Sequence, residues 1–201
     1  MSAALLLRHG GATPIRYWKP IQTGIEEDDD TRVVEALTGC GSALRDGVRL
    51  PRPVSPHLAA RLSGERIDIA DLLTIAGEQS HTDRFIVEGA GGVLVPLNES
   101  ALMIDLIQGL GLPVVIVARS TLGTINHTLL TVEALRARTV PVAGVVVNGP
   151  QNAENCAAIE QYGEVEVLGE LSTCAVLNHD ALLAQLPSLD PNGRLAPLFR
   201  S

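Results

Sequence analysis

From Met103 onward, short apolar runs alternate with segments whose apolar residues recur at helical spacing. The pattern predicts helices over Met103–Leu110 and Ile125–Arg136, and buried strands over Pro113–Ala118 and Val142–Val147. Strands that alternate with helices are joined by crossover connections, and such connections produce parallel sheets. The sequence therefore predicts an α/β fold of three layers, in which helices cover both faces of a mostly parallel sheet.

Weaker signals extend this alternation toward both ends of the chain. The further predictions are helices over Met1–Gly11, Thr31–Leu37, His57–Leu62, Ile69–Ala76, Ala153–Tyr162 and Asp180–Leu186, and strands over Pro14–Trp18, Phe85–Val87 and Val165–Leu168. Ser55 is a candidate N-cap for the helix that begins at His57. With 46% hydrophobic and 19% charged residues, we expect one globular domain over residues 1–201.

A carboxylate and a glycine-rich loop follow the predicted strand Phe85–Val87. Glu88 comes directly after this apolar run, and the loop Gly89–Gly92 follows it. In open parallel sheets, ligands bind beyond the carboxyl ends of strands, and magnesium there binds carboxylate and phosphate oxygens. The stretch therefore suits a magnesium nucleotide, with a plain glycine-rich turn as the alternative. It is not a dinucleotide fingerprint, which requires a glycine in place of Leu94.

Other charged residues lie near a second strand end. Lys19 follows the predicted strand Pro14–Trp18, so its ammonium group is either a phosphate contact or a solvated surface charge. The acidic run Glu26–Asp30 leads into the helix Thr31–Leu37. Acidic side chains at a helix amino end favour the helix dipole, which is the simplest interpretation of the three aspartates in this run.

Two polar segments later in the chain also follow strands. The loop Arg119–Asn126 contains Gly123, and the strand Val142–Val147 ends at Asn148. Because the strands are parallel, both segments face the same rim of the predicted sheet. The side-chain amide of Asn148 can bind an adenine edge, or it can initiate a turn in the sequence Asn-Gly-Pro.

Composition excludes several classes of protein. The formal charge is −8, and the chain has one tryptophan, two tyrosines and two phenylalanines, which argues against a nucleic-acid partner. Its apolar runs are shorter than the roughly 20 residues of a membrane helix, and no signal-peptide pattern is found. We therefore expect no membrane partner and a cytoplasmic location. The three cysteines form no C-x-x-C pair, so neither disulfides nor zinc are expected.

Three separated motifs together resemble the dethiobiotin synthetase family, whose members use ATP to close the ureido ring in biotin synthesis. The motifs are Y-W-K-P-I-Q-T-G (Tyr17–Gly24), V-E-G-A-G-G-V-L-V-P-L (Val87–Leu97) and L-G-T-I-N-H (Leu122–His127). Their order and spacing are also similar, and V-V-V-N (Val145–Asn148) falls at the family's adenine contact. The resemblance covers Ser2–Gly169, and it implies a P-loop NTPase-like fold.

The resemblance also implies a reaction and its partners. The family's substrate is the diamine fatty acid 7,8-diaminononanoate, which reacts with carbon dioxide to form a carbamate. ATP, with Mg²⁺, phosphorylates the carbamate, and the second amine then displaces phosphate. The enzyme mainly positions the reactants and neutralises charge. Because the family binds the substrate carboxylate from the neighbouring subunit, a homodimer is implied.

Site residues follow from the same resemblance. Lys19 is the implied catalytic lysine, which stabilises the transferring phosphoryl group, and Asp30 and Glu88 are the implied magnesium ligands. Asp30 is chosen among the aspartates because the Asp-Thr pair that enters the helix matches the family. The implied substrate-binding residues are Thr23, Gly123, Thr124, Ile125 and Asn126. The implied ATP-binding residues are Asp30, Glu88, Gly89, Ala90, Gly91, Asn148 and Gly149.

The sequence departs from the family at two places. Leu171–Cys174 stands where the family often has a proline-rich segment beside the adenine. The family also begins with a strand and a G-x-x-x-x-G-K-T phosphate loop, and this sequence contains no such motif. We therefore expect the natural reading frame to encode that strand and loop upstream of Met1. The alternatives are a catalytically silent homologue that acts as a dimeric binding module, and an amidotransferase-associated synthetase domain.

Overall fold

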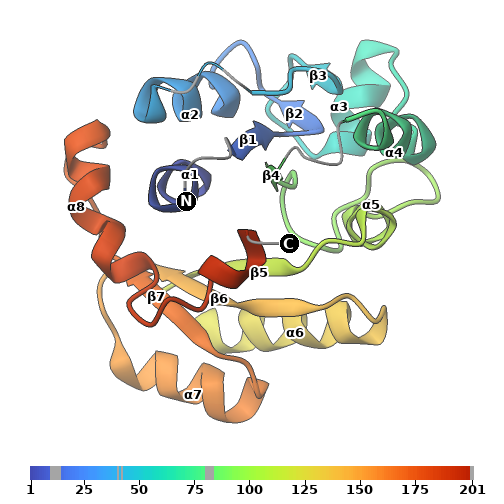
Figure 1. Cartoon of the computed structure of the whole chain (residues 1–201). Coiled ribbons are helices and arrows are strands. Elements are labelled where there is room, and N and C mark those ends of the chain that lie inside the picture. Colours follow the sequence, from blue (N-terminus) through green and yellow to red (C-terminus); the bar gives the residue numbers. More distant parts are fainter. Residues whose placement is uncertain (10–14, 40, 42, 80–83, 200–201) are drawn as a thin grey trace. The chain divides into compact units, whose positions relative to one another are not determined.

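The computed structural model describes residues 1–9, 15–39, 41, 43–79 and 84–199 (Figure 1). The chain forms two compact units. The glycine-loop unit contains residues 10–111, and the three-strand unit contains residues 3–9 and 112–201. Both units combine parallel strands with helices, which confirms the predicted α/β fold class.

Two short parallel pairs of strands form the framework of the glycine-loop unit. They are β1 (Ile15–Trp18) with β4 (Arg84–Val87), and β2 (Ile21–Thr23) with β3 (Val48–Leu50). The helices are α2 (Asp30–Thr38), α3 (Pro56–Ser63), α4 (Ile69–Gly77) and α5 (Met103–Leu110). Apolar side chains of β2, β3, α3, α4 and α5 form one core, which includes Ile21, Leu72 and Leu106. This core reaches the glycine loop, because Ala90 belongs to it.

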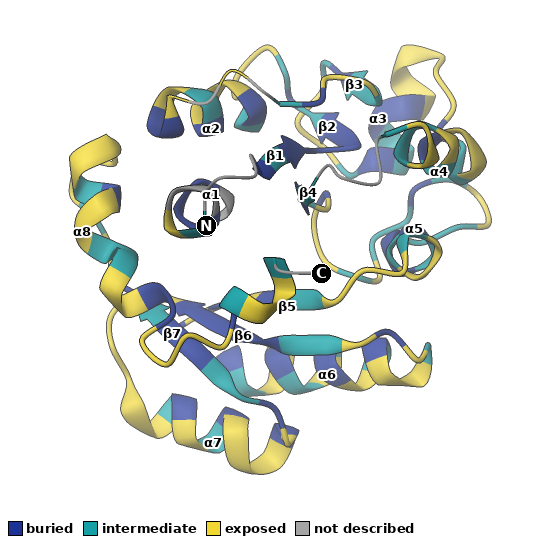
Figure 2. Cartoon of the chain, viewed as in Figure 1, coloured by how far each residue is buried: buried dark blue, intermediate teal, exposed yellow. Residues whose placement is uncertain are grey.

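A single parallel sheet organises the three-strand unit. Its strands are β5 (Val114–Arg119), β6 (Val142–Asn148) and β7 (Val167–Leu171), in the order β5-β6-β7. The helical elements are α1 (Ser2–His9), α6 (Thr124–Ala137), α7 (Ala153–Gly163), α8 (His179–Leu189) and the 3-10 turn η1 (Ala196–Phe199). The central strand β6 is buried from Gly144 to Val147, as expected of a strand with neighbours on both edges (Figure 2). The imidazole of His9 stacks on Phe199 with ring centroids 4.7 Å apart, which fastens α1 to the end of this unit.

The alternation predicted from Met103 onward is confirmed. The helix predicted over Met103–Leu110 has these bounds in the structure, and the other helices and the strands β5 and β6 lie within a few residues of their predicted ranges. The helix predicted over Met1–Gly11 is described only to His9, and Pro14 of the predicted first strand lies outside the described residues. None of the described helices is long and apolar enough to cross a membrane.

Four details of the prediction differ from the structure. Strands β2 and β3 and the turn η1 were not predicted, because elements of three or four residues are too short to show a period. The last strand begins at Val167 rather than Val165, since Glu164 takes a left-handed φ of 46° at the end of α7.

The other two differences concern side chains. Ser55 makes no side-chain cap; its carbonyl instead accepts from the N–H groups of Leu58 and Ala59. In β4, Ile86 is buried, whereas Phe85 and Val87 are partly exposed. Among the described residues, β4 is hydrogen-bonded to a strand along one edge only, that of β1, and is therefore less covered than a central strand.

Candidate active site

The backbone around Lys19 is held by residues 44–49, which we call the strap. Lys19 directly follows β1, and the strap runs beside it. Three hydrogen bonds join the strap to carbonyl groups of residues 17–20: Leu44 N to Tyr17 O at 2.8 Å, Val48 N to Pro20 O at 2.9 Å, and Arg49 Nη1 to Lys19 O at 2.9 Å. The indole Nε1 of Trp18 donates in the opposite direction, to the carbonyl of Asp46 at 2.8 Å. The backbone position of Lys19 is therefore fixed from both sides.

Gly47 allows the strap to approach β1 this closely. Its φ is +133°, and a Cβ atom at this position would lie 2.3 Å from the carbonyl oxygen of Pro20. Both the backbone conformation and the space require glycine. A side chain at position 47 would push the strap away from the segment that carries Lys19.

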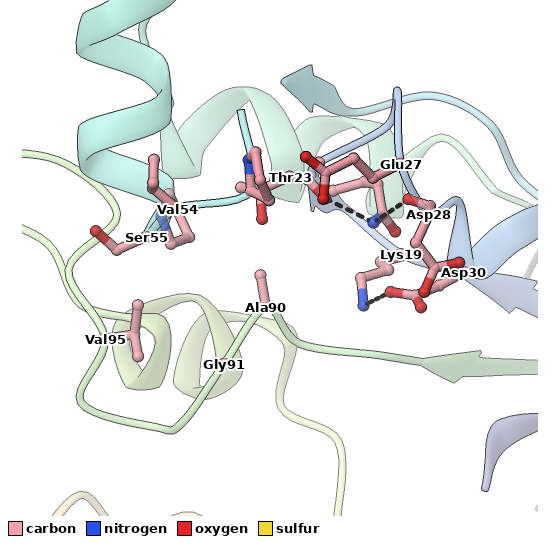
Figure 3. A pocket seen from close by; sticks show the side chains of 14 residues that line it. Lys19, Thr23, Glu27, Asp28, Asp30, Val54, Ser55, Ala90, Gly91 and Val95 are labelled. Atoms are coloured by element: carbon pink, nitrogen blue, oxygen red, sulfur yellow. Dashed lines mark hydrogen bonds and ion pairs between the residues drawn. The ribbon is translucent and has the colours of Figure 1, made fainter. Parts of the chain in front are cut away.

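The ammonium group of Lys19 lies between two carboxylates. Lys19 is 7% exposed, and its Nζ atom lies 3.0 Å from Oε1 of Glu88. Nζ also forms an ion pair with Asp30 (Figure 3). A buried charge is costly unless it is paired, so the two carboxylates make the position of Lys19 possible. The interpretation of Lys19 as a solvated surface residue is wrong.

Strand pairing explains how Glu88 reaches Lys19. The N–H of Glu88 donates to the carbonyl of Trp18 at 2.8 Å, which continues the β1–β4 ladder beyond the last paired residues of both strands. Because the two strands are parallel, their carboxyl ends meet at one edge. Residues far apart in the sequence thereby come together at the predicted place.

Tyr17 completes this charged group from the same strand. Its hydroxyl donates to Oε2 of Glu88 at 3.2 Å, and the residue is 2% exposed. Burial, followed by the charges of Glu88 and Asp30, raises the pKa of Tyr17 well above its usual range, so the hydroxyl remains a donor. Sequence analysis did not select Tyr17. The signal was available, because side chains alternate along a strand and positions 17 and 19 share a face.

The three consecutive aspartates have different environments. Asp29 is the N-cap of α2 and accepts hydrogen bonds from the N–H groups of Thr31 and Arg32. Asp30 is the first residue of α2 and pairs with Lys19. Helix stabilisation is therefore the right interpretation of Asp29, while Asp30 lies where a cation-binding carboxylate is expected. Asp28 borders a cavity beside them.

Gln22 fixes the turn that carries these aspartates, and sequence analysis did not select it. Its side chain is 4% exposed, and Nε2 donates to the carbonyl oxygens of Thr23 at 2.9 Å and Asp28 at 3.4 Å. The N–H groups of Glu27 and Asp28 both donate to the carbonyl of Gly24 at 2.9 Å. These hydrogen bonds close the acidic turn, and the turn places Asp30 beside Lys19.

The charged group borders a cavity of about 380 Å³. Lys19, Asp28 and Asp30 lie on one side of it, and Val54, Ser55 and Val95 lie on the other, with Thr23 and Ala90 between them (Figure 3). The glycine loop forms part of its lining, since Ala90 and Gly91 both contribute. A single ligand in this cavity can therefore contact charged side chains on one side and mainly apolar side chains on the other.

The glycine loop is packed closely against its surroundings. Gly91 has a φ of +79°, and a Cβ atom there would lie 3.0 Å from Val95 Cγ2; at Gly89 it would lie 3.4 Å from Met103 Sδ. Glycine at position 91 is therefore required by conformation as well as by space.

The remaining predicted residues lie in the three-strand unit. Gly123 is the N-cap of α6 with a φ of +91°, and Asn126 is exposed in the first turn of the helix. Thr124 is buried, and its Oγ1 has no hydrogen-bond partner among the described residues. Ile125 is half-buried. The N-terminal N–H groups of α6 lack partners within the helix, as at any helix start, and can bind an anionic group.

Asn148 and Gly149 lie at the carboxyl end of β6. The carbonyl of Asn148 accepts from the N–H of Ser120 at 3.1 Å, and the N–H of Gly149 donates to Leu171 O at 2.8 Å. A Cβ atom at Gly149, whose φ is +135°, would lie 2.4 Å from Oγ of Ser120. The backbone is thus occupied by strand pairing, while the side chain of Asn148 is exposed.

The charged group suits a magnesium ion. Two carboxylates, Asp30 and Glu88, converge on one positive group, and magnesium binds through one or two carboxylates together with substrate phosphates. Within the described residues no cluster of three or more His, Cys, Asp or Glu side chains could hold a metal by itself. A cation held by Asp30 and Glu88 would therefore need water or ligand oxygens to complete its coordination.

Comparison with known proteins gives consistent results. The sequence model of a family described as "AAA domain" matches residues 1–181. An ATP-dependent dethiobiotin synthetase from Paramagnetospirillum magneticum is 49% identical over 188 residues, which cover 93% of this chain and 87% of that protein. Another, from Rhodopseudomonas palustris strain HaA2, is 46% identical over 176 residues, which cover 87% of this chain and 81% of that protein.

Among solved structures, the chain is similar to a ParA family ATPase from Chlorobium tepidum TLS. The TM-score is 0.52 over 98% of this chain and 88% of that one. With 11% sequence identity, the likeness is one of fold alone.

Proposed function

Since the chain belongs to the ATP-dependent dethiobiotin synthetase family, we propose that it carboxylates 7,8-diaminononanoate and closes the ureido ring of dethiobiotin, with ATP and Mg²⁺. The observation that supports this most is the position of Lys19, buried between Asp30 and Glu88 at the edge of the cavity. A scaffold protein gains little from a buried lysine between two acids, whereas phosphoryl transfer requires positive charge near the transferring group.

In this proposal the chain's residues position reactants and balance charge. One amine of the substrate adds to carbon dioxide and gives a carbamate, whose oxygen takes the γ-phosphoryl group of ATP. The second amine then attacks the carbonyl carbon, and phosphate leaves. Lys19 stabilises the negative charge on the transferring group, and Thr23 lines the cavity beside the reacting amines. Bound magnesium, held by Asp30 and Glu88, would neutralise phosphate oxygens.

The glycine loop and the three-strand unit have binding roles in the proposal. The backbone of Gly89, Ala90 and Gly91 faces the nucleotide phosphates, and Asn148 with Gly149 binds the base. The start of α6, Gly123–Asn126, binds the carboxylate of a substrate held by a second subunit, so the active form is a homodimer. The apolar side chain of Leu122, which precedes Gly123, is fully exposed. An exposed apolar side chain at this place supports a contact with a second subunit.

The direct test is formation of dethiobiotin. Purified protein is incubated with 7,8-diaminononanoate, bicarbonate, ATP and magnesium, and product is measured by mass spectrometry together with phosphate release. In protein that forms product, we expect a loss of about a thousandfold in Lys19→Met, because the lysine acts on charge that develops in the transition state. Arg32→Met is the matched control, since Arg32 is exposed and pairs with the cap Asp29. Nucleotide binding without product would instead support the binding-module alternative.

A further inference from the structure

Lys19 occupies the place that the proposed function gives to magnesium. Its Nζ atom contacts Glu88 at 3.0 Å and pairs with Asp30, the same two carboxylates. We propose that the Lys19 ammonium group is the resident cation of this carboxylate pair, and that magnesium displaces it into the neighbouring cavity. The inference rests on the proposed function, because it assigns the metal to these carboxylates.

One pair of carboxylates cannot serve both cations in this geometry. Magnesium requires oxygen atoms at about 2.0–2.1 Å in a near-octahedral arrangement. The ammonium group already lies at hydrogen-bond distance from the oxygens that would supply two of these ligands. A dication held there repels a positive charge beside it. Binding of the metal therefore requires Lys19 Nζ to leave.

Only the side chain of Lys19 has to move. Its carbonyl accepts from Arg49 Nη1 at 2.9 Å, and the strap holds the residues on either side of it. The lysine side chain, by contrast, has a flexible four-carbon stem. Lys19 also lines the cavity of about 380 Å³, so the ammonium group has space to enter.

The two carboxylates keep their own supports when the lysine leaves. Glu88 accepts from the buried hydroxyl of Tyr17 at 3.2 Å, and its N–H remains bonded to Trp18 O. Asp30 belongs to the first turn of α2, which the side chain of Asp29 caps. The acids therefore stay in place for the metal while the lysine changes position.

This exchange gives Lys19 two successive roles. Without metal, the ammonium group neutralises Asp30 and Glu88 and stabilises the empty site. With metal bound, the same group is free to contact phosphoryl oxygens in the cavity. The lysine thus becomes available for phosphoryl transfer only when magnesium is present.

The sequence allows a direct test, because Lys19 is the only lysine in the chain. An amine-directed reagent, trinitrobenzenesulfonate, is applied to the folded protein without nucleotide, and modification of Lys19 is measured by peptide mass spectrometry. We expect modification to be severalfold faster in magnesium chloride than in sodium chloride of equal ionic strength. The α-amino group serves as an internal control whose rate should not change.

A second measurement uses metal affinity rather than reactivity. Mn²⁺ replaces magnesium as the probe, and its binding is followed by water proton relaxation without nucleotide. Lys19→Met should bind Mn²⁺ roughly tenfold more tightly than the unchanged protein, the factor expected when two part-exposed ion pairs no longer compete. Arg32→Met removes a positive charge from the first turn of α2, which also carries Asp30. Its affinity for Mn²⁺ should stay within about twofold of that of the unchanged protein.

The outcomes separate this inference from the proposed function. If Mn²⁺ binds and Glu88→Gln weakens it, but Lys19→Met does not tighten it and magnesium leaves the modification rate unchanged, the exchange is wrong while the metal site stands. If the unchanged protein binds no Mn²⁺ with or without ATP, both ideas fail. Should Lys19→Met not fold, the modification experiment on the unchanged protein decides the question alone.

Discussion

The two units of the molecule hold their site residues in different electrostatic states. In the glycine-loop unit, Lys19, Asp30, Glu88 and Tyr17 contact one another, so opposite charges and donors are already paired. In the three-strand unit, the side chain of Asn148 is exposed, and the first N–H groups of α6 lack partners within the helix, as at any helix start.

The difference shows how each unit can take part in binding. Paired charges form a defined arrangement without a ligand, and a ligand must then replace existing contacts. Unpaired backbone donors and an exposed amide gain partners only when a ligand arrives. Changes in the glycine-loop unit should therefore alter stability and chemistry, whereas changes at the rim of the three-strand unit should alter affinity alone.

The largest expected effect is that of Gly47→Ala. The new Cβ atom would overlap Pro20 O, and the φ of +133° adds backbone strain, so we expect a loss of about 3 kcal/mol or more in the free energy of unfolding. Urea unfolding measures it. Gly77→Ala is the control, because nothing lies within 4 Å of its Cβ and the residue is helical, so stability should stay equal or rise. Equal stabilities for the two variants would show that the strap does not hold Lys19.

Glu88→Gln should have the next largest effect. The change keeps the shape of the side chain but removes one metal-binding charge, so the magnesium concentration for half-maximal rate should rise roughly 10- to 100-fold. Thermal melting without metal should change little, because Asp30 still pairs with Lys19 and the amide oxygen of the new side chain can still accept from the Tyr17 hydroxyl. A drop of many degrees without metal would assign Glu88 a structural role.

Gly123→Ala tests the three-strand unit. Alanine is strained at a φ of +91°, and the first turn of α6 should shift, so KM for the diamine should rise by roughly five- to tenfold while kcat is kept. Steady-state kinetics measure both constants. Glu133→Ala is the control, because Glu133 is exposed on α6 outside its first turn, so both constants should stay unchanged. An equal fall in kcat would contradict the division of roles between the units.

The smallest expected effect concerns Cys156. Burial, followed by the charge of Glu170, raises the pKa of its thiol from 9.0 to about 11. The folded protein therefore holds this proton more tightly than the unfolded chain, so the stability it contributes is complete below pH 9 and is lost as pH rises through 11. The difference in Tm between the unchanged protein and Cys156→Ala should be constant up to pH 9 and shrink above it. A constant difference up to pH 11 would show that folding does not raise the pKa of this thiol.

The predictions from sequence were correct where the spacing of apolar residues identifies a helix or strand, or where a residue directly follows a predicted strand. The alternation from Met103 predicted α5, β5, α6 and β6, and the apolar run Phe85–Val87 predicted that Glu88 lies at the carboxyl end of a strand. It missed Tyr17 and Gln22, whose importance depends on contacts with Glu88 and Asp28. Such contacts join residues far apart or across a tight turn, and no local pattern encodes them.

The sequence by itself determined the α/β class, the charged residue types and their places at strand ends, because these follow from periodicity and chain order. Only the tertiary structure decided which of three adjacent aspartates pairs with Lys19 and which caps α2. It also showed that Lys19 is buried and that Gly47 must be glycine. The physical reason is that pairing a buried charge and packing one backbone against another depend on distances across the fold, which local sequence does not contain.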